Sequence, residues 1–497
     1  MYYKIAKSFA SFVISKNQIW IKNPIQSQTK TLKNLINNGS KTLFGKQHFF
    51  KDISKYEEFK ESIPVRDYEK FKIYINRIIE GESDVVWPGK PVYFSKTSGT
   101  TSGIKYIPIF KNAINTHINS ARDSILQYIV NNGDTSFIKG KQIFIQGSPT
   151  LKIKKGIKVG RLSGIVAHHL PFYVRSSRMP SWEVNCIDDW EEKINAIVEE
   201  TINQNMTLIG GIPPWVQMYF EKIKEKSGQK VGDVFKNFSL FVYGGVSFKP
   251  YKKIFDELIG RKVNSLEVYP ASEGFFAFQD QIDNESMLLV LNNHIYYEFI
   301  KTDDFLIGKN NYVSLSDVKV GVNYALTIST SSGLWRYNIG DTIQFTEVDP
   351  YRIIVTGRIK HFISAFGEHV IAKEVETTIR EVSLKLKLGI REFTVAPQVN
   401  PKNGLPFHEW FIEFDEINDN LEATEIIMDK IMQRQNIYYK DLIGGKILSP
   451  LRITKIKKGG FNNYMKSIGK LGGQNKVPHL SNDRKIVNQL KNYIIQQ

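Results

Sequence analysis

The stretch that decides the fold runs from Met206 to Tyr269 and reads MTLIGGIPPWVQMYFEKIKEKSGQKVGDVFKNFSLFVYGGVSFKPYKKIFDELIGRKVNSLEVY. Three short β-rich runs lie in it, at Met206–Ile209, Leu240–Tyr243 and Ser265–Tyr269. Segments with helical spacing lie between them, at Pro214–Lys226 and Pro250–Ile259. Strands that alternate with helices indicate parallel βαβ units. The sequence therefore predicts an α/β protein.

The alternation of strand-like and helix-like segments extends upstream of this stretch, whereas the chain directly after it is mostly β-like. Upstream lie a β-rich run at Gln142–Gln146 and a helical segment at Asp189–Asn203. The first ~90 residues show apolar spacing near 3.6 residues, which predicts helices. Residues 287–355 are mostly β-like, and a helix, two strands and another helix follow, at 372–386, 393–396, 409–414 and 422–433. We expect a large N-terminal domain over residues 1–356, with βαβ units and a β-rich part. A small C-terminal α+β domain is expected over residues 357–497.

The composition is that of a globular protein without a disulfide framework. Apolar residues make up 41% of the 497 residues and aromatic residues 12%. The single cysteine, Cys186, excludes a multi-cysteine zinc or iron–sulfur site. No uninterrupted apolar run reaches the ~18 residues of a membrane helix, and the apolar run near the N-terminus is too short for a secretory signal. We therefore predict a cytoplasmic protein with no membrane partner.

The net charge of +17 raises the hypothesis of nucleic-acid binding. From residue 441 to the C-terminus, eleven Lys or Arg residues stand against two acidic residues. Such a patch can bind polyanions by counterion release. A solvated lysine-rich face, or a domain that closes over a phosphate-bearing substrate, uses positive charge equally well. Because no zinc-finger spacing and no RNA-binding aromatic–basic motif occurs, nucleic-acid binding is disfavoured.

A dense Ser/Thr/Gly segment follows the β-rich run Val92–Phe94 and reads YFSKTSGTTSGIK from Tyr93 to Lys105. Glycines let backbone N–H groups converge on an anion, and hydroxyls add donors without bulk. The spacing is not that of a Walker P-loop. A flexible linker is the alternative, but a linker rarely connects a strand to an amphipathic helix such as the one expected at Ala113–Ile129. We expect a phosphate cradle formed by Ser98, Gly99, Thr100, Thr101, Gly103 and Lys105.

Two acidic residues stand where ligand contacts are common. Glu273 follows Tyr269-Pro-Ala271-Ser272, a predicted tight turn at the carboxyl end of a strand, where open α/β sheets bind ligands. Its carboxylate is a candidate Mg²⁺ ligand. Asp341 ends the segment GLWRYNIGD (333–341) and can accept hydrogen bonds from two vicinal hydroxyls, as acidic residues do on ribose. The plainer alternatives are a solvated loop charge for Glu273 and a hairpin turn at Gly-Asp.

Two basic segments lie further along the chain. The segment TGRIKHFISAFGEHV (356–370) carries Arg358 and Lys360 at the expected domain boundary. The segment GKLGGQNKVP (469–478) places Lys476 on a glycine-rich loop. From such a loop a lysine can reach a site and stabilise charge on a transferring phosphoryl group. The alternative for Lys476 is one more exposed surface lysine.

Other catalytic constellations are missing from the sequence. There is no Gly-x-Ser-x-Gly elbow and no His-Glu-x-x-His zinc motif. His168 and His169 are adjacent, so on a regular element they face different directions, which favours packing or acyl-pocket roles over a metal pair. The segment Arg161–Arg178 is therefore a candidate part of an acyl pocket.

The order of these segments resembles that of the adenylate-forming enzymes, the superfamily of acyl-CoA synthetases, peptide-synthetase adenylation domains and luciferases. Within it, LWRYNIGD (334–341), ASEG (271–274) and GGQNKVP (472–478) are most similar to the acyl acid-amido synthetases of the auxin-responsive Gretchen Hagen family, here a bacterial-type member. The resemblance runs from Asn23 to Leu490. Two positions depart from it. One residue separates Gly103 from Lys105 where the family usually has two, and His479 stands where an arginine is expected.

The resemblance implies an ATP-dependent ligase that adenylates a carboxylic acid and passes the acyl group to an amine, expected to be an amino acid. It implies that Ser98, Thr100 and Thr101 hold phosphate and that Glu273 places Mg²⁺. The other implied nucleotide contacts are Gly244, Gly245 and Tyr269 around adenine, Ala271 and Ser272 in the same turn as Glu273, and Asp341 and Arg358 on the ribose. Lys476, Glu273 and Lys105 are the expected catalytic residues. The small domain would rotate about a hinge at Lys360.

Two other functions stay open on the sequence. An acid–thiol ligase would share the adenylation step but form a thioester. A non-catalytic nucleotide- or nucleic-acid-binding protein would release no AMP, and its affinity would fall steeply with salt.

Overall fold

The computed structural model describes residues 2–98, 104–170, 172–245, 248–249, 251–359, 362–363, 370–399, 401–416, 420–444, 448–472, 476–481 and 484–495. The chain divides into two compact units. The first consists of residues 1–246 and 261–355, and the second of residues 247–260 and 356–497.

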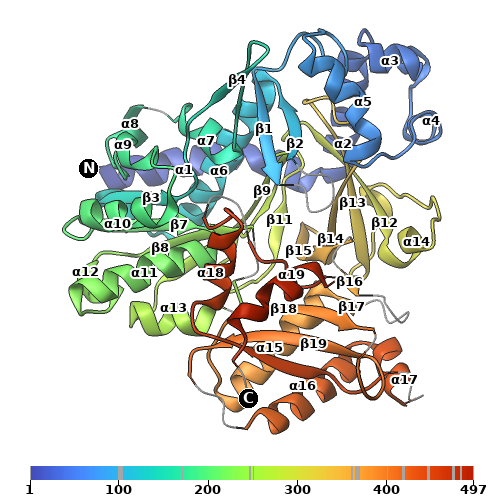
Figure 1. Cartoon of the computed structure of the whole chain (residues 1–497). Coiled ribbons are helices and arrows are strands. Elements are labelled where there is room, and N and C mark those ends of the chain that lie inside the picture. Colours follow the sequence, from blue (N-terminus) through green and yellow to red (C-terminus); the bar gives the residue numbers. More distant parts are fainter. Residues whose placement is uncertain are drawn as a thin grey trace. The chain divides into compact units, whose positions relative to one another are not determined.

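The first unit is built on a mixed sheet with the strand order β12-β13-β14-β15-β11-β10-β9-β8-β7-β3-β6 (Figure 1). Its parallel half consists of β3 (Lys141–Ile145), β6 (Arg178–Met179), β7 (Met206–Gly211), β8 (Leu240–Gly244) and β9 (Asn264–Ala271). The helices α10 (Trp190–Thr201) and α11 (Pro213–Ser227) connect these strands. Pro213 begins α11, where the missing N–H of proline is tolerated. The predicted α/β fold with parallel βαβ units is confirmed.

Helices cover both faces of this parallel half. Leu208, Leu240 and Val242 project from one face into a core shared with α1 (Tyr2–Lys22) and α6 (Lys111–Asn132). Side chains alternate along a strand, so Ile209 and Phe241 point to the opposite face, where α11 contacts β7. Strands buried on both faces appear in sequence as continuous apolar runs, which is the pattern of MTLI and LFVY.

The other half of the sheet is antiparallel. Its strands are β10 (Gly274–Phe278), β11 (Met287–Leu289), β12 (Ile295–Lys301), β13 (Asn323–Thr330), β14 (Tyr337–Val348) and β15 (Tyr351–Arg358). The N-terminal helices α2 (Pro24–Gly39), α3 (Leu43–Gln47), α4 (Tyr56–Ser62) and α5 (Tyr68–Ile79) share a core with these strands. Within the N-terminal region predicted to be helical, the chain leaves the helix between α4 and α5 at Ile63, because the residue before a proline, here Pro64, disfavours helical backbone.

A smaller sheet of the first unit has the order β2-β1-β5-β4. It contains β1 (Tyr93–Ser98), β2 (Ile104–Ile109), β4 (Lys152–Lys154) and β5 (Ile157–Gly160). The Ser/Thr/Gly loop thus connects two strands of a hairpin, paired from Tyr93–Ile109 to Ser98–Ile104. The sequence-based expectation of a strand leading through the loop directly to α6 is wrong, because β2 lies between them. The short helices of this unit are α7 (Leu162–Ala167), α8 (Phe172–Arg175), α9 (Trp182–Asn185), α12 (Val231–Val234) and α14 (Thr302–Leu306).

The second unit packs helices against a three-stranded sheet of order β18-β19-β20. Its strands are β18 (Ile390–Gln398), β19 (Phe407–Phe414) and β20 (Arg452–Ile456), with the short pair β16 (Phe362–Ile363) and β17 (Val370–Ile371). Its helices are α13 (Lys252–Ile259), α15 (Ala372–Leu386), α16 (Leu421–Gln435), α17 (Ile437–Gly444), α18 (Gly460–Ser467) and α19 (Lys485–Gln489). Val375, Ile379, Trp410 and Met432 form its core between α15, α16 and the sheet.

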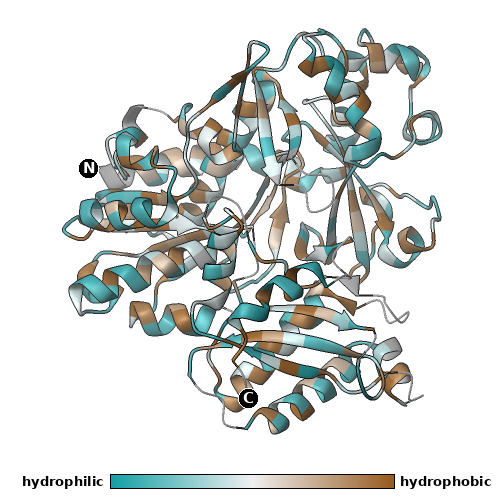
Figure 2. Ribbon diagram, viewed as in Figure 1, coloured by the Kyte–Doolittle hydropathy of each residue, from teal (hydrophilic) through white to brown (hydrophobic). Residues whose placement is uncertain are grey.

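Helices on the surface of both units carry hydrophobic and hydrophilic residues in alternation along their lengths, as α11 and α16 show in Figure 2. This is the pattern of helices with one face buried and one in water. Within the part of the chain that the structure describes, none of the helices is both long and apolar enough to cross a membrane.

Candidate functional site

The carboxyl ends of β8 and β9 lie on one edge of the parallel half of the sheet. Gly244 ends β8, and a β-carbon on it would stand 2.3 Å from the Val268 carbonyl oxygen, so only glycine fits there. Gly245 has a φ of +83°, which favours glycine. The turn Ala271-Ser272-Glu273 follows at the end of β9 and leads into β10. Parallel strands that end side by side form the edge at which open α/β sheets bind ligands.

Asp341 reaches this edge from the antiparallel half of the sheet. The Tyr269 hydroxyl donates a hydrogen bond to Asp341 Oδ2 at 2.6 Å. Asp341 and Gly340 lie inside β14, in a register irregularity opposite β13, and not in a hairpin turn. The Asn338 side-chain oxygen accepts from the Gly340 N–H at 2.7 Å, and Gly340 has a φ of +85°. The bulge turns the Asp341 carboxylate toward Tyr269, so the turn alternative for Gly-Asp is wrong.

Strand β1 is tied to the same edge through Ser95. Its side chain is fully buried, and its hydroxyl donates to the Ser272 hydroxyl oxygen at 2.8 Å. A role for Ser95 was not predicted from the sequence, although a serine among the apolar residues of a buried strand can indicate a buried polar contact. Ser98 ends β1 and is described by its backbone only. Gly99, Thr100, Thr101 and Gly103 lie outside the described residues.

Lys105 lies on β2, opposite Thr97 of β1. Its ammonium group is 5.5 Å from the centre of the Tyr68 ring, within the range of a cation–π contact. Lys105, Tyr269, Ser272 and Asp341 therefore all lie in the first unit, on the hairpin, on β9 and the turn after it, and on β14.

The remaining predicted residues belong to the second unit. Arg358 ends β15, and Gly357 before it has a φ of +149° and lies against Ala372. Lys360 lies outside the described residues. Lys476 is exposed and begins the described segment 476–481.

The Leu334–Tyr337 part of the motif is structural. Arg336 is 1% exposed and its Nε lies 3.0 and 2.9 Å from the two carboxylate oxygens of Glu298. The Nη1 of Arg336 donates to the carbonyl oxygens of Lys60 and Ile63, each at 2.7 Å. The Trp335 indole N–H donates to the Val86 carbonyl oxygen at 2.9 Å. These residues fasten the N-terminal helices to the sheet that carries Asp341.

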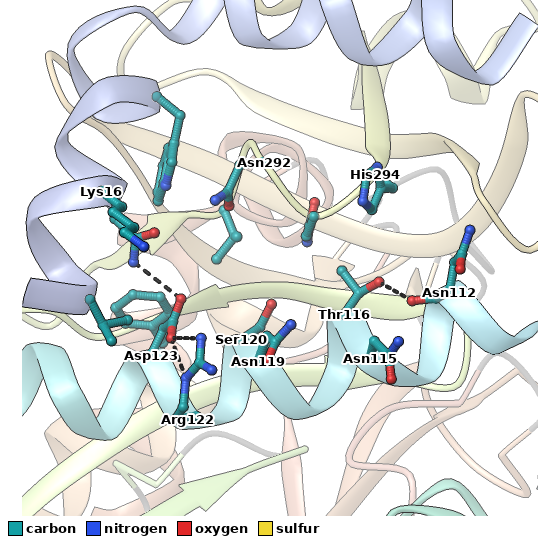
Figure 3. A pocket seen from close by; sticks show the side chains of 16 residues that line it. Lys16, Asn112, Asn115, Thr116, Asn119, Ser120, Arg122, Asp123, Asn292 and His294 are labelled. Atoms are coloured by element: carbon teal, nitrogen blue, oxygen red, sulfur yellow. Dashed lines mark hydrogen bonds and ion pairs between the residues drawn. The ribbon is translucent and has the colours of Figure 1, made fainter. Parts of the chain in front are cut away.

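The described residues of the first unit form cavities at its surface. One, of about 370 Å³, lies between α1, α6 and residues 290–294. Figure 3 shows Asn112, Asn115 and Asn119 along the α6 side of it, with Asn292 and His294 opposite. The described residues predicted from sequence do not line this cavity.

The second cavity, of about 390 Å³, is lined by Thr150, Leu151, Ile153, Lys158, His168, Trp182 and Cys186. Ile153 is 74% exposed and Trp182 50%, so the cavity offers apolar surface to solvent. The His168 ring packs edge-to-face on Trp182, whereas His169 Nε2 lies 2.8 Å from the Tyr93 hydroxyl. The two adjacent histidines thus have different partners.

Among the described residues there is no cluster of three or more His, Cys, Asp or Glu that could hold a metal ion by protein ligands alone. Mg²⁺ bound together with a nucleotide needs only one or two carboxylates, because phosphate oxygens and water complete its shell. Glu273, half-buried on its turn, fits that requirement.

Comparison with known proteins identifies the family to which the chain belongs. Models of the GH3 family N-terminal, central and C-terminal domains match residues 15–263, 288–358 and 371–485, in that order. The chain belongs to the GH3 family. A family relative, jasmonoyl-L-amino acid synthetase JAR4 of Nicotiana attenuata, is 23% identical over 93% of this chain and 91% of its own length.

Solved structures show the same fold. The acyl acid amido synthetase GH3.15 aligns with a TM-score of 0.82 at 16% identity, covering 99% of this chain and 97% of its own. A 2-hydroxyisobutyryl-CoA ligase in the postadenylation state aligns with a TM-score of 0.62 at 13% identity, covering 94% and 91%. The fold of this GH3 chain is therefore that of the adenylate-forming enzymes.

Proposed function

We propose that this chain is an ATP-dependent acyl acid-amido synthetase, a ligase that joins a carboxylic acid to an amine with release of AMP and pyrophosphate. The observation that carries the proposal is the ordered match of all three GH3 domains. The juxtaposition of Tyr269, Asp341 and the Ser272–Glu273 turn in one unit supports it. A carboxylate is a poor acyl donor because oxide is a poor leaving group, and adenylation replaces oxide with AMP.

In the first step, a carboxylate oxygen of the acid attacks the α-phosphorus of ATP. A bond forms between that oxygen and phosphorus, the bond from phosphorus to the β-bridging oxygen breaks, and pyrophosphate leaves. Such transfer needs positioning and charge neutralisation more than covalent chemistry by the protein. Ser98, Gly99, Thr100, Thr101 and Gly103 hold phosphate, Asp341 and Arg358 hold the ribose, and Gly244, Gly245 and Tyr269 flank adenine. Ala271 and Ser272 contact the nucleotide from the turn that carries Glu273.

Three residues help to balance the negative charge of the reacting phosphate. Lys476 stabilises the transition state, and Lys105 is a second cation, close to the loop of the hairpin. Glu273 would hold Mg²⁺, which neutralises phosphate charge when bound.

In the second step, the amine nitrogen attacks the acyl carbon of the adenylate. A C–N bond forms, the bond from that carbon to the AMP oxygen breaks, and the amine gives up a proton as AMP leaves. One arrangement cannot easily hold both the pyrophosphate-expelling lysine and the incoming amine. We therefore propose that the C-terminal domain, residues 357–497, rotates between the steps about a hinge at Lys360.

The hydrocarbon part of the acid is assigned to the cavity at Ile153, His168 and Trp182. Strand β5, which leads to this cavity, pairs with β1 from Tyr93 to Ser95, and Ser95 contacts Ser272. Exposed apolar surface beside a ligand edge is characteristic of a binding groove. An acid with an aromatic or aliphatic body fits this groove, and an amino acid is the expected amine.

The function is tested by AMP release from ATP over a matrix of carboxylic acids and acceptors. The acceptors include the amino acids and coenzyme A, because an acid–thiol ligase shares the fold. We expect AMP only when an apolar acid and an amino acid are both present, with an amide detected by mass spectrometry. A thioester product would assign the chain to the thiol ligases. No AMP with any pair would favour a non-catalytic nucleotide-binding protein.

A further inference from the structure

The segment that carries Lys476 is attached to β18 in the second unit. The Val395 N–H donates to the His479 carbonyl oxygen at 3.0 Å, and the Ser481 N–H donates to the Val395 carbonyl oxygen at 2.9 Å. The Thr394 hydroxyl donates to the Pro478 carbonyl oxygen at 2.6 Å. Lys476 is thus three residues away from a backbone attachment to a buried strand.

The side chain of His479 lies between two carboxylates from different elements. Its Nδ1 is 3.2 Å from Glu376 Oε1 on α15, and its Nε2 is 3.2 Å from Glu392 Oε1 on β18. The ring stacks on Phe393 with a centroid distance of 4.1 Å, and 9% of the side chain is exposed. A neutral imidazole has one N–H and can donate to one carboxylate only, whereas an imidazolium donates to both.

Tyr251 is a further titratable group in contact with this cluster, and the Glu413 carboxylate interacts electrostatically with Glu392. The Tyr251 hydroxyl donates to Glu392 Oε2 at 3.3 Å, and burial and the charges of Glu392 and Glu376 hold its pKa well above the ordinary value. Burial alone would lower the pKa of His479, but hydrogen bonds to Glu376 and Glu392 and their negative charge outweigh it and raise the pKa to about 9. The doubly donating form is therefore the populated form at neutral pH.

We propose that His479 is a positioning residue for Lys476: by bridging Glu376 and Glu392 it fixes the segment 476–481 on β18 and so holds the lysine for adenylation. The role of Lys476 in this statement rests on the proposed function, whereas the anchoring of the segment does not. As long as Glu376 and Glu392 are ionised, the raised pKa of His479 gives the bridge its full stabilising contribution at a pH below the unfolded value of 6.5. That contribution is lost as the pH rises through about 9.

The anchoring is tested without any activity, because the lysine-specific protease Lys-C can cut the chain after the exposed Lys476 and does not cut after the arginine of a His479→Arg variant. Brief digestion at pH 7.5 with mass spectrometry compares the wild type with His479→Gln, His479→Arg and Glu376→Gln. We expect cleavage after Lys476 to be about tenfold faster in His479→Gln, intermediate in Glu376→Gln and close to wild type in His479→Arg, from the loss of one or two charged hydrogen bonds. Lys402, exposed in the same unit, is the internal control and keeps its rate. Wild-type cleavage after Lys476 in His479→Gln overturns the proposal.

The coupling to catalysis is tested by the pH profile of acid-dependent ATP–pyrophosphate exchange. We expect the wild-type rate to fall on the alkaline side with a midpoint near pH 9. His479→Arg, which stays charged, should move this decline upward, and His479→Gln should be about 10- to 100-fold slower at pH 7. If the alkaline decline of the exchange rate has the same midpoint pH in His479→Arg as in the wild type, it belongs to another group, and the positioning role is overturned. A wild type without any acid-dependent exchange would contradict the proposed function, while the proteolysis experiment still tests the anchor.

Discussion

At the scale of single residues, Lys476 is the charge on which the proposed adenylation step depends most. We expect Lys476→Ala to lower acid-dependent ATP–pyrophosphate exchange by about 10²–10³-fold, the usual cost of removing one donor that stabilises a transition state. The loss should lie in kcat, since other residues bind the nucleotide. Lys470→Ala, at an exposed lysine near the same glycine-rich stretch, is the matched control and should keep its rate. Undiminished exchange in Lys476→Ala would remove this lysine from the mechanism.

Arg336 is a residue whose importance is structural. Arg336→Met leaves the buried Glu298 carboxyl without its partner, and we expect the free energy of unfolding in urea to fall by about 3–5 kcal/mol. Burial already raises the pKa of Glu298, so the carboxyl of this variant should take up a proton on folding. The double variant Arg336→Met with Glu298→Leu should recover most of the loss, because no buried charge remains. Equal destabilisation of the single and double variants would show that the ion pair is not the cause.

At the scale of elements, Ser95 connects β1 to the turn after β9. A neutral hydrogen bond contributes about 0.5–1.5 kcal/mol, so Ser95→Ala should slow exchange by about 2- to 10-fold. Ser272→Ala removes the same bond from the other side. The two changes together should cost little more than either alone, since residues in one hydrogen bond are coupled. Additive losses in this double-mutant cycle, measured by exchange rate with thermal unfolding as the check on folding, would mean that the bond does not position the turn.

The strands β3, β7, β8 and β9 and the helices α10 and α11 could be predicted from their local sequence, whereas the two-residue strand β6 (Arg178–Met179) has no such signal and was missed. The segments MTLI and LFVY are buried on both faces, and their runs of mostly apolar residues predict such burial. The hairpin β1–β2 could not be placed, because the β2 sequence Ile104–Ile109 contains Lys105 and Pro108 and has no clear period. The bulge at Gly340-Asp341 was equally hidden, since a Gly-Asp pair is more typical of a turn and only pairing with β13 reveals the strand.

At the scale of the whole molecule, the two-step chemistry predicts a change of arrangement between the domains. Lys360→Pro fixes the backbone at the proposed hinge and should block amide formation while sparing acid-dependent ATP–pyrophosphate exchange, because only the second step needs the rotation. Both rates are measured on the same preparation, with Lys360→Ala as a control that keeps the backbone free. Equal loss of both steps in Lys360→Pro would contradict the rotation.

The α/β class, the succession of ligand-binding segments and the family they resemble follow from local periodicity and from motifs that are contiguous in the chain. Which of these segments meet became known from the three-dimensional arrangement of the chain. Tyr269 and Asp341 are 72 positions apart and Ser95 and Ser272 are 177 apart, yet each pair is hydrogen-bonded. The bridge formed by His479 likewise joins it to Glu376, 103 positions away, and to Glu392, 87 positions away. Contacts of this kind depend on strand order and register, to which distant parts of the chain contribute together.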